Sequence, residues 1–287
     1  MHLGNVYAAL LSWLFARHAG GRWLLRIEDL DPDRSRQEYA DQIMRDLEWL
    51  GLTWDGTPIY QSRRTEIYRH YFDRLEVQGL VYPCFCTRAD ILATQAPHQS
   101  DNRVVYAGTC RSLSSEQVAE RMKAKAPAWR LMMPDTESQY TDAVYGPQRC
   151  NLARDCGDIV IRRADGAYAY QLAVSFDDAM TGVTQVVRGN DLLLSAHQQI
   201  AICRMLGLTP PQYAHLPLLL NQNGQRLSKR DKSMDLGALK QKYSPEQLLG
   251  RLALITGLTA TSAPLTAQEL LLTFKPEKVK PGDISVE

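Results

Sequence analysis

Near its start, the chain carries hydrophobic side chains at helical spacing. Within residues 5–18, the positions i, i+4, i+7 and i+8 are occupied by Val6, Leu10, Trp13 and Leu14. This spacing predicts an amphipathic helix, and the consecutive glycines at 20–21 are expected to end it. The mainly apolar run W-L-L-R-I-E at 23–28 then predicts a short buried strand.

The alternation of strand and helix continues downstream. Ser35 is a candidate N-cap for a helix that ends before Gly51. The hydrophobic stripe of this helix consists of Tyr39, Ile43, Leu47 and Leu50. A third helix is predicted over about 63–78. Because such alternation favours a parallel sheet covered by helices, the predicted fold class is α/β.

An irregular segment, 84–110, interrupts this alternation and has the character of an insertion. Beyond it, I-V-I-R-R from Ile159, an Asp-Gly turn at 164–166 and A-Y-A-Y-Q-L-A form a hairpin pattern. The strand V-T-Q-V-V-R then leads into a helix near 192–206, with Gly207 suited to its C′ position.

The C-terminal part begins after a tight turn at Asn223-Gly224. Leucines at helical spacing predict helices within 235–273. The tail 276–287 is polar, so we expect it to be poorly ordered.

Composition narrows the class of protein. The 287 residues are 45% hydrophobic and 23% charged, which is ordinary for a globular chain and excludes collagen-like, disordered and disulfide-scaffold classes. The net charge of +1 gives no global field for nucleic acid. No apolar run reaches the roughly 18 residues that cross a bilayer, and no signal-peptide pattern is seen, so we expect a cytoplasmic location.

Two segments have the character of phosphate-binding sites. His2-Leu3-Gly4-Asn5 stands before the first helix, where unpaired N–H groups and a close-packing glycine suit a phosphate. Its simpler interpretation is a frayed end. The segment 226–232 places four cations just after the Asn-Gly turn, and a flexible lysine there suits a triphosphate that loses pyrophosphate. Its simpler interpretation is a solvated basic loop.

Charged residues at the ends of predicted strands are candidate ligands for a small molecule. Glu28 ends a buried strand, where α/β sheets bind ligands and where a carboxylate could hold an ammonium group. A helix-capping acidic turn is the alternative. Arg188 also ends a strand, with Tyr170, Asp177, Asp178 and Asp191 nearby in sequence, and its fork could grip a carboxylate. A surface ion pair is the alternative.

Cysteines in the insertion suggest a metal site. The pattern is Cys84-x-Cys86 followed by Tyr106-x-x-x-Cys110, so three thiols and a phenol could bind zinc tetrahedrally. His98 could replace Tyr106, and three reduced structural thiols are the alternative. We interpret Cys150 and Cys156 as ordinary thiols. The chain has no Walker A, G-x-G-x-x-G, G-x-S-x-G or H-E-x-x-H motif, which removes several nucleotide-binding and hydrolase classes.

Taken in order, these segments resemble glutamyl-tRNA synthetases. The matching segments are H-L-G-N at 2–5, S-W-L-F-A-R at 12–17, L-R-I-E-D-L-D at 25–31, L-G-L-T-W-D at 50–55, V-V-R-G-N-D-L at 186–192 and R-L-S-K-R at 226–230. H-L-G-N corresponds to the HIGH signature and L-S-K-R to the KMSKS signature. The resemblance covers most of residues 1–255 and implies a Rossmann-like class I catalytic domain.

The cysteine pattern also resembles the short paralogues of that family, the glutamyl-queuosine tRNA(Asp) synthetases. Full glutamyl-tRNA synthetases continue into an anticodon-binding domain, for which too few residues follow Lys232. The resemblance implies ATP-dependent activation of L-glutamate without tRNA, and transfer of glutamate to queuosine in the anticodon of tRNA(Asp). The implied partners are ATP, L-glutamate and the queuosine-bearing anticodon stem-loop, with no membrane; we expect a monomer.

The resemblance also implies roles for individual residues. His2 and Lys229 would be catalytic, and ATP would be bound by His2, Gly4, Asn5, Leu227, Ser228, Lys229 and Arg230. Glutamate would be bound by Glu28, Tyr170 and Arg188. One structural zinc ion would be held by Cys84, Cys86, Tyr106 and Cys110, and Mg²⁺ would accompany ATP.

The same comparison predicts four parts of the chain: 1–82 and 151–233 as the two halves of the catalytic domain, 83–150 as the zinc-bearing insertion, and 234–287 as a helical C-terminal region.

The family has a strand and loop of the type R-F-A-P-S-P-T-G before H-x-G, whereas Met1 directly precedes His2 here. We therefore expect a version extended upstream to be more stable and more active. A catalytic-domain fragment of a tRNA(Glu)-charging enzyme and a non-catalytic paralogue are the alternatives.

Overall fold

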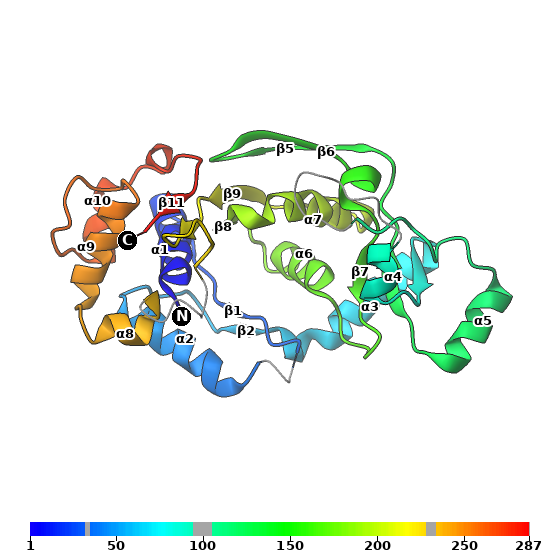
Figure 1. Ribbon diagram of the computed structural model, residues 1–287. Helices are drawn as coiled ribbons and strands as arrows, with labels where there is room; N and C mark the ends of the chain where they lie inside the picture. The colour runs from blue at the N-terminus through cyan, green and yellow to red at the C-terminus, as the bar shows by residue number, and fades with distance from the viewer. Residues whose placement is uncertain (32–34, 94–104, 228–233, 287) are drawn as a thin grey trace.

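The computed structural model describes residues 1–31, 35–93, 105–227 and 234–286 (Figure 1). Its helices are α1 (Leu3–His18), α2 (Gln37–Trp49), α3 (Thr65–Val77), α4 (Arg88–Ala93), α5 (Ser115–Ala124), α6 (Tyr170–Met180), α7 (Leu193–Met205), α8 (Leu236–Lys240), α9 (Pro245–Ile255) and α10 (Ala267–Thr273). Its strands are β1 (Arg26–Ile27), β2 (Ile59–Tyr60), β3 (Val81–Cys84), β4 (Ala128–Leu131), β5 (Glu137–Asp142), β6 (Gly146–Asn151), β7 (Ile159–Arg162), β8 (Gln185–Gly189), β9 (Gln212–Leu216), β10 (Leu219–Leu220) and β11 (Ile284–Ser285).

The largest sheet of the described residues has four strands in the order β6-β5-β9-β8. β8 and β5 each run parallel to β9, whereas β5 and β6 form an antiparallel hairpin. The carboxyl ends of parallel strands meet at one edge of a sheet, where α/β folds bind ligands. Arg188 and His215 are register partners at that edge.

The predicted first helix is present but is more buried than an amphipathic helix would be. Leu10, Leu11 and Leu14 are all 0% exposed, because the hydrophobic positions occupy most of the circumference of α1. The C-terminal helices cover one side of α1 (Figure 1), and the ring of Phe274 meets that of Phe15 at a centroid distance of 5.4 Å. The N- and C-terminal segments therefore share one hydrophobic core.

The strand predicted at 23–28 is confirmed only at Arg26–Ile27, which pairs in parallel with β2. Helices α2 and α3 are confirmed. Ser35 is not the N-cap of α2: the helix begins at Gln37, so its N-cap is Arg36, and no side chain caps it. Ser35 instead donates its backbone N–H to the carbonyl of Asp31.

The hairpin predicted after Ile159 is wrong in its second arm. β7 forms only a single antiparallel bridge with that arm, between Arg162 and Tyr168, and α6 begins at Tyr170. The true partner of β7 is β4, in the antiparallel sheet β3-β4-β7. The helix wins because Leu172, Ala173 and Phe176 all become fully buried at helical spacing.

The insertion pattern at 84–110 is followed by α5, β4 and the β5–β6 hairpin. The hairpin reaches back into the four-stranded sheet, where Asp142 of β5 pairs with Tyr213 of β9. Residues 94–104, including His98, lie outside the described residues. Helix α5 lies at the far end of the molecule from α9 and α10 (Figure 1).

The C-terminal region is helical as predicted, in three short helices, and Gly207 and Gly224 adopt the expected positive φ of +70° and +71°. The tail, however, is ordered rather than loose. Its strand β11 pairs in parallel with β10, and Val279 and Val286 are buried. Because the tail is polar overall, its composition did not indicate that these two valines are buried. No helix in the described part of the chain is both long and apolar enough to span a membrane.

Candidate functional site

A cavity of about 140 Å³ lies at the N-terminal end of α1. Its lining includes His2, Gly4 and Asn5 from the start of the chain, and Arg226 and Leu227 from the basic segment. The two candidate phosphate-binding segments therefore meet at one cavity, although they are far apart in sequence. Ser228, Lys229 and Arg230 lie outside the described residues.

The H-L-G-N segment forms the first turn of α1 and does not simply precede it. His2 is the N-cap, and its backbone N–H donates to the side-chain oxygen of Asn5 at 3.1 Å. Gly4 lies against the imidazole: a Cβ atom on Gly4 would be 3.1 Å from Cε1 and 3.2 Å from Nδ1 of His2. Gly4 therefore leaves room for the imidazole ring of His2, which lies beside the N-terminus of α1.

The opposite wall of the cavity is the turn after β8. Gly189 is crowded there, because a Cβ atom would lie 2.7 Å from Oδ1 of Asp191 and 2.9 Å from Cδ2 of Leu218. Asp191 forms an ion pair with Arg226. This pair ties the turn after β8 to the first residue of the basic segment.

Two carboxylates of the acidic turn after β1 differ in their surroundings: one is held by structural hydrogen bonds, and the other remains accessible to solvent. Asp29 accepts hydrogen bonds from the backbone and hydroxyl of Ser62 at 2.8 and 2.6 Å, as in the structural interpretation. Glu28 accepts one from Nη2 of Arg26 at 3.1 Å, and its side chain is still 43% exposed. Arg26 also pairs with the buried Asp178. Glu28 is therefore a carboxylate of this turn that a ligand can reach.

Tyr170 begins α6 and stands among charged groups from three elements. Its pKa is raised, first by burial and then by the negative charge of Glu28, while Arg188 and Arg26 act in the opposite direction. The residue nevertheless keeps 38% of its surface exposed. Tyr170 therefore interacts electrostatically with both Glu28 and Arg188, the other two predicted glutamate-binding residues.

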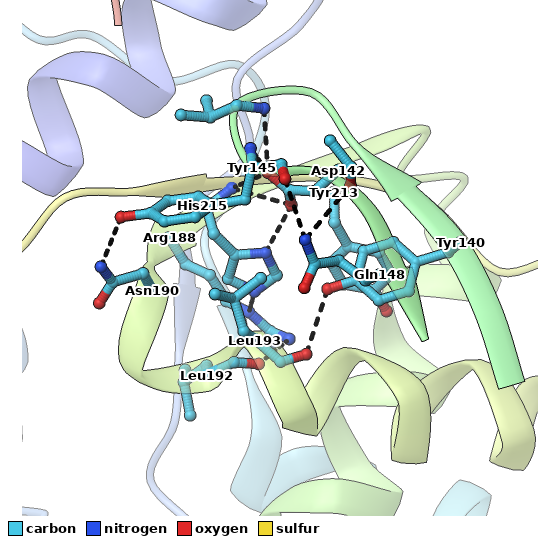
Figure 2. Close-up of polar contacts among 12 residues, drawn as sticks. Tyr140, Asp142, Tyr145, Gln148, Arg188, Asn190, Leu192, Leu193, Tyr213 and His215 are labelled. Carbon is cyan, nitrogen blue, oxygen red and sulfur yellow. Dashed lines mark hydrogen bonds and ion pairs between the residues drawn. The ribbon is translucent and has the colours of Figure 1, made fainter. Parts of the chain in front are cut away.

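Hydrogen bonds to an imidazole, an amide and a backbone carbonyl hold Arg188. Its Nε donates to Nε2 of His215 at 3.2 Å (Figure 2). One terminal nitrogen donates to Oε1 of Gln199 at 2.8 Å. The other terminal nitrogen donates to the carbonyl of Leu192 at 3.3 Å. Within the described residues no salt bridge joins Arg188 to a carboxylate, so the alternative of a surface ion pair is not supported. A cation held in this way retains its charge for an anionic ligand.

Sequence reasoning missed the residues behind Arg188. His215 and Asp142 have fully buried side chains joined by a 2.6 Å contact between Nδ1 and Oδ2. A polar residue at the carboxyl end of an apolar parallel strand was the available signal for His215. Asp177 has a structural role: its buried carboxylate accepts from Gln61, Arg64 and Tyr68.

Three thiols and a phenol converge in the predicted metal site. The sulfur atoms of Cys84, Cys86 and Cys110 all lie within 4.8 Å of one another. The hydroxyl of Tyr106 is 3.4 Å from Sγ of Cys84 and 3.6 Å from Sγ of Cys86, and the latter is 3.6 Å from Sγ of Cys110.

These spacings fit a metal ion. Tetrahedral coordination with metal–sulfur bonds of about 2.3 Å would place neighbouring sulfurs about 3.8 Å apart. Outside the cluster, Nε of Arg130 donates to Sγ of Cys84 at 3.2 Å, and its guanidinium lies 3.8 Å from the ring centroid of Tyr106. Such a contact stabilises a metal-bound thiolate. The cluster could therefore hold a metal ion.

Solved structures confirm the predicted fold. A glutamate–tRNA ligase from Elizabethkingia meningosepticum, in complex with its amino acid, matches with a TM-score of 0.81 and 27% identity over 99% of this chain. A glutamate–tRNA synthetase from Elizabethkingia anophelis matches with a TM-score of 0.83 and 27% identity over the whole chain. The chain spans 64% and 66% of these two longer proteins.

Sequence relatives are closer. Glutamyl-Q tRNA(Asp) synthetase from Nitratidesulfovibrio vulgaris is 46% identical over 275 residues, which is 92% of this chain and 85% of the relative. The protein of the same name from Symbiobacterium thermophilum is 45% identical over 286 residues, or 96% and 88% of the two chains. The family model "tRNA synthetases class I (E and Q), catalytic domain" matches residues 1–279. The chain therefore belongs to the class I tRNA synthetases of the E and Q group and, within that group, to the glutamyl-Q tRNA(Asp) synthetases.

Proposed function

We propose that this protein activates L-glutamate with ATP, without tRNA, and transfers the glutamate to queuosine in the anticodon of tRNA(Asp). The observation that carries the proposal is the 46% identity to a glutamyl-Q tRNA(Asp) synthetase over 92% of the chain. Identity to the glutamate–tRNA ligases is 27%, which favours this function over that of a tRNA(Glu)-charging fragment.

The first step joins glutamate to AMP. A carboxylate oxygen of glutamate attacks the α-phosphorus of ATP, and the bond to pyrophosphate breaks. His2, Gly4 and Asn5 would face the nucleotide at the start of α1, where N–H groups and the helix dipole favour phosphate. The shared cavity of His2 and Leu227 supports a role in ATP binding for Leu227 and for the residues that follow it, Ser228, Lys229 and Arg230. Lys229 would stabilise the leaving pyrophosphate, and Mg²⁺ would neutralise phosphate charge.

The amino acid would lie between β1, α6 and β8. Glu28 would bind its ammonium group, because this carboxylate remains accessible after pairing with Arg26. Arg188 would bind a carboxylate, and Tyr170 would line the pocket between them. No side-chain nucleophile is needed, so catalysis rests on positioning and charge stabilisation.

The second step transfers the glutamyl group to RNA. A hydroxyl of the cyclopentene-diol of queuosine attacks the activated carbonyl, and AMP leaves. A protein of this kind can present its catalytic pocket to the anticodon loop itself. We retain 1–82 and 151–233 as catalytic halves, 83–150 as the insertion and 234–287 as the C-terminal region. We also retain a cytoplasmic location and a monomeric state.

The metal in the cysteine cluster would be zinc, with a structural role. Three thiolates and one oxygen in tetrahedral spacing are the ligand set that zinc accepts. Bound zinc would join Cys84 and Cys86 after β3 to Tyr106 and Cys110, and so fix the two ends of the segment between them. The cluster lies outside the cavity at α1, which supports a structural role over a catalytic one.

The decisive experiment supplies labelled glutamate and ATP with queuosine-bearing or queuosine-free tRNA(Asp). We expect glutamate-dependent ATP–pyrophosphate exchange in the absence of RNA, and label transfer only to the queuosine-bearing tRNA. Exchange that requires tRNA(Glu) would instead favour the charging fragment. ATP binding that is undetectable while tRNA binding persists would favour a non-catalytic paralogue.

A further inference from the structure

Two buried residues with no part in the proposed reaction stand behind Arg188. The side chains of His215 and Asp142 are both 0% exposed. We propose that His215, held by Asp142, is a positioning residue that fixes the guanidinium of Arg188 for a carboxylate of glutamate. This inference rests on the proposed function, which makes Arg188 a glutamate ligand.

The sheet brings the three residues together. His215 lies near the end of β9, the strand between β5 and β8. Arg188 is its direct register partner on β8, and Asp142 ends β5 beside Tyr213 of β9. Backbone pairing therefore sets the order Asp142–His215–Arg188 across neighbouring strands (Figure 2).

Asp142 is held as an anion. Burial opposes ionisation of its carboxyl group, but hydrogen bonds from His215 and from backbone N–H groups outweigh that effect and hold its pKa below the usual value. The backbone donors are Val144 at 3.0 Å, Tyr145 at 2.9 Å and His215 itself at 3.1 Å. A carboxylate can only accept, so Nδ1 of His215 must carry the proton in the 2.6 Å contact.

The tautomer fixed by Asp142 gives Arg188 its acceptor. With its proton on Nδ1, a neutral His215 presents the lone pair of Nε2 to Nε–H of Arg188 at 3.2 Å. A guanidinium has five N–H groups. His215, Gln199 and the carbonyl of Leu192 engage three, one on each nitrogen. Within the part of the chain that the structure describes, one N–H on each terminal nitrogen has no other partner, which matches the two oxygens of a carboxylate.

The aromatic ring of Tyr213 restricts the guanidinium further. Cζ of Arg188 lies 5.1 Å from the Tyr213 ring centroid, and that ring is stacked with His215 at an interplanar angle of 14°. His215, Gln199, Leu192 and Tyr213 thus set the plane and rotation of Arg188, and the imidazole separates its guanidinium from the carboxylate of Asp142. An arginine fixed in this way loses less freedom when it binds its ligand.

The test uses two variants of His215 that each preserve one of its two hydrogen bonds. His215→Asn places an amide donor near the position of Nδ1, so it can keep Asp142 but cannot reach Arg188. His215→Gln places an amide oxygen near the position of Nε2, so it can accept from Arg188 but loses Asp142. His197→Asn is the matched control, because His197 is also buried and its Nδ1 contacts Ser138, at 2.8 Å.

The readout is tRNA-free ATP–pyrophosphate exchange, with KM measured separately for glutamate and ATP. We expect His215→Asn to raise KM for glutamate roughly ten- to hundredfold, the effect of a hydrogen bond to a charged group, with KM for ATP unchanged. His215→Gln should recover most of that loss, and His197→Asn should leave KM for glutamate at the wild-type value. Thermal melting of each variant confirms that it is folded.

The outcomes separate this inference from the proposed function. A wild-type protein without glutamate-dependent exchange would overturn the proposed function and this inference with it. Wild-type exchange together with an unchanged glutamate KM in His215→Asn would overturn the role of His215 alone. Equal losses in the two His215 variants, or a parallel rise in KM for ATP, would show a merely structural histidine and would also overturn it.

Discussion

Gly4 lies directly against the imidazole of His2, so that a Cβ atom at position 4 would be 3.1 Å from Cε1 of the ring. This spacing is tighter than ordinary van der Waals contact, and the ring would have to shift by a few tenths of an ångström to admit a methyl group. The size of residue 4 therefore affects where the imidazole of His2 lies at the proposed nucleotide site.

Gly4→Ala should therefore impair ATP use while sparing the fold. Alanine is the better helix former, so the free energy of unfolding should fall by no more than about 1 kcal/mol, or even rise. The displaced imidazole should lower the rate of ATP–pyrophosphate exchange by about tenfold or more, the usual effect of a misplaced catalytic group. Gly79→Ala, at a turn with φ of +69° and no atom within 4 Å of the added Cβ, is the control: it costs backbone strain but should leave the exchange rate unchanged. An unchanged exchange rate in Gly4→Ala would contradict a role for the position of His2.

Sequence patterns predicted those elements whose burial matches a simple period. Helix α2 and the turn at Asn223-Gly224 were placed correctly because spacing and glycine chemistry are local signals. The arm that follows β7 was misassigned because A-Y-A-Y favours a strand locally, whereas Leu172 and Phe176 are buried only in a helix. Long-range packing decided that conflict, and sequence periodicity does not report it.

In the candidate site, too, local sequence signals identified some residues, whereas long-range packing brought in others. The motifs at His2 and Arg226 could be identified from the sequence as candidate phosphate-binding segments, and the structure brings both to one cavity. Asp142 carried no such signal, and His215 carried only that of a polar residue at the end of a strand, because each gains its partner only when β5 and β9 pair. Their connection to Arg188 depends on strand register, which no local pattern records.

Arg188→Lys tests whether the guanidinium fork binds a carboxylate. Lysine keeps the positive charge but offers a single point donor in place of a bidentate one, and it cannot maintain the contacts with His215, Gln199 and Leu192 together. We expect KM for glutamate to rise by about tenfold or more, with KM for ATP unchanged. Arg204→Lys, an exposed arginine at the end of α7, should behave as wild type. A change confined to KM for ATP would remove Arg188 from the amino-acid pocket.

Asp142 should make stability depend on acid pH. Its pKa is lower in the folded state than in the unfolded chain, so its stabilisation is fully present above the ordinary carboxyl pKa of about 4. It is lost as the pH falls from there through the folded-state pKa. Asp142→Asn should lower the free energy of unfolding by about 2 kcal/mol at neutral pH, and the difference from wild type should narrow below pH of about 4.

Urea unfolding at a series of pH values measures this difference. Asp73→Asn, an exposed carboxyl on α3, is the control and should follow the wild-type curve. A gap between Asp142→Asn and wild type that stays constant down to strongly acid pH would show that the carboxylate charge of Asp142 does not contribute.

The cysteine cluster should account for the metal content and for part of the stability of the protein. Purified protein should contain about one zinc ion per chain, and replacing both Cys84 and Cys86 by serine should abolish zinc binding, because metal affinity depends on the complete ligand set. Cys203→Ser is the control, since that thiol is buried in α7 and is absent from the cluster. Elemental analysis gives the metal content, and thermal melting with and without a chelator gives the stabilisation. Because the metal is proposed to be structural, the chelator should lower Tm before it lowers the exchange rate at moderate temperature. Zinc retained in the double variant, or lost equally in Cys203→Ser, would place the metal elsewhere.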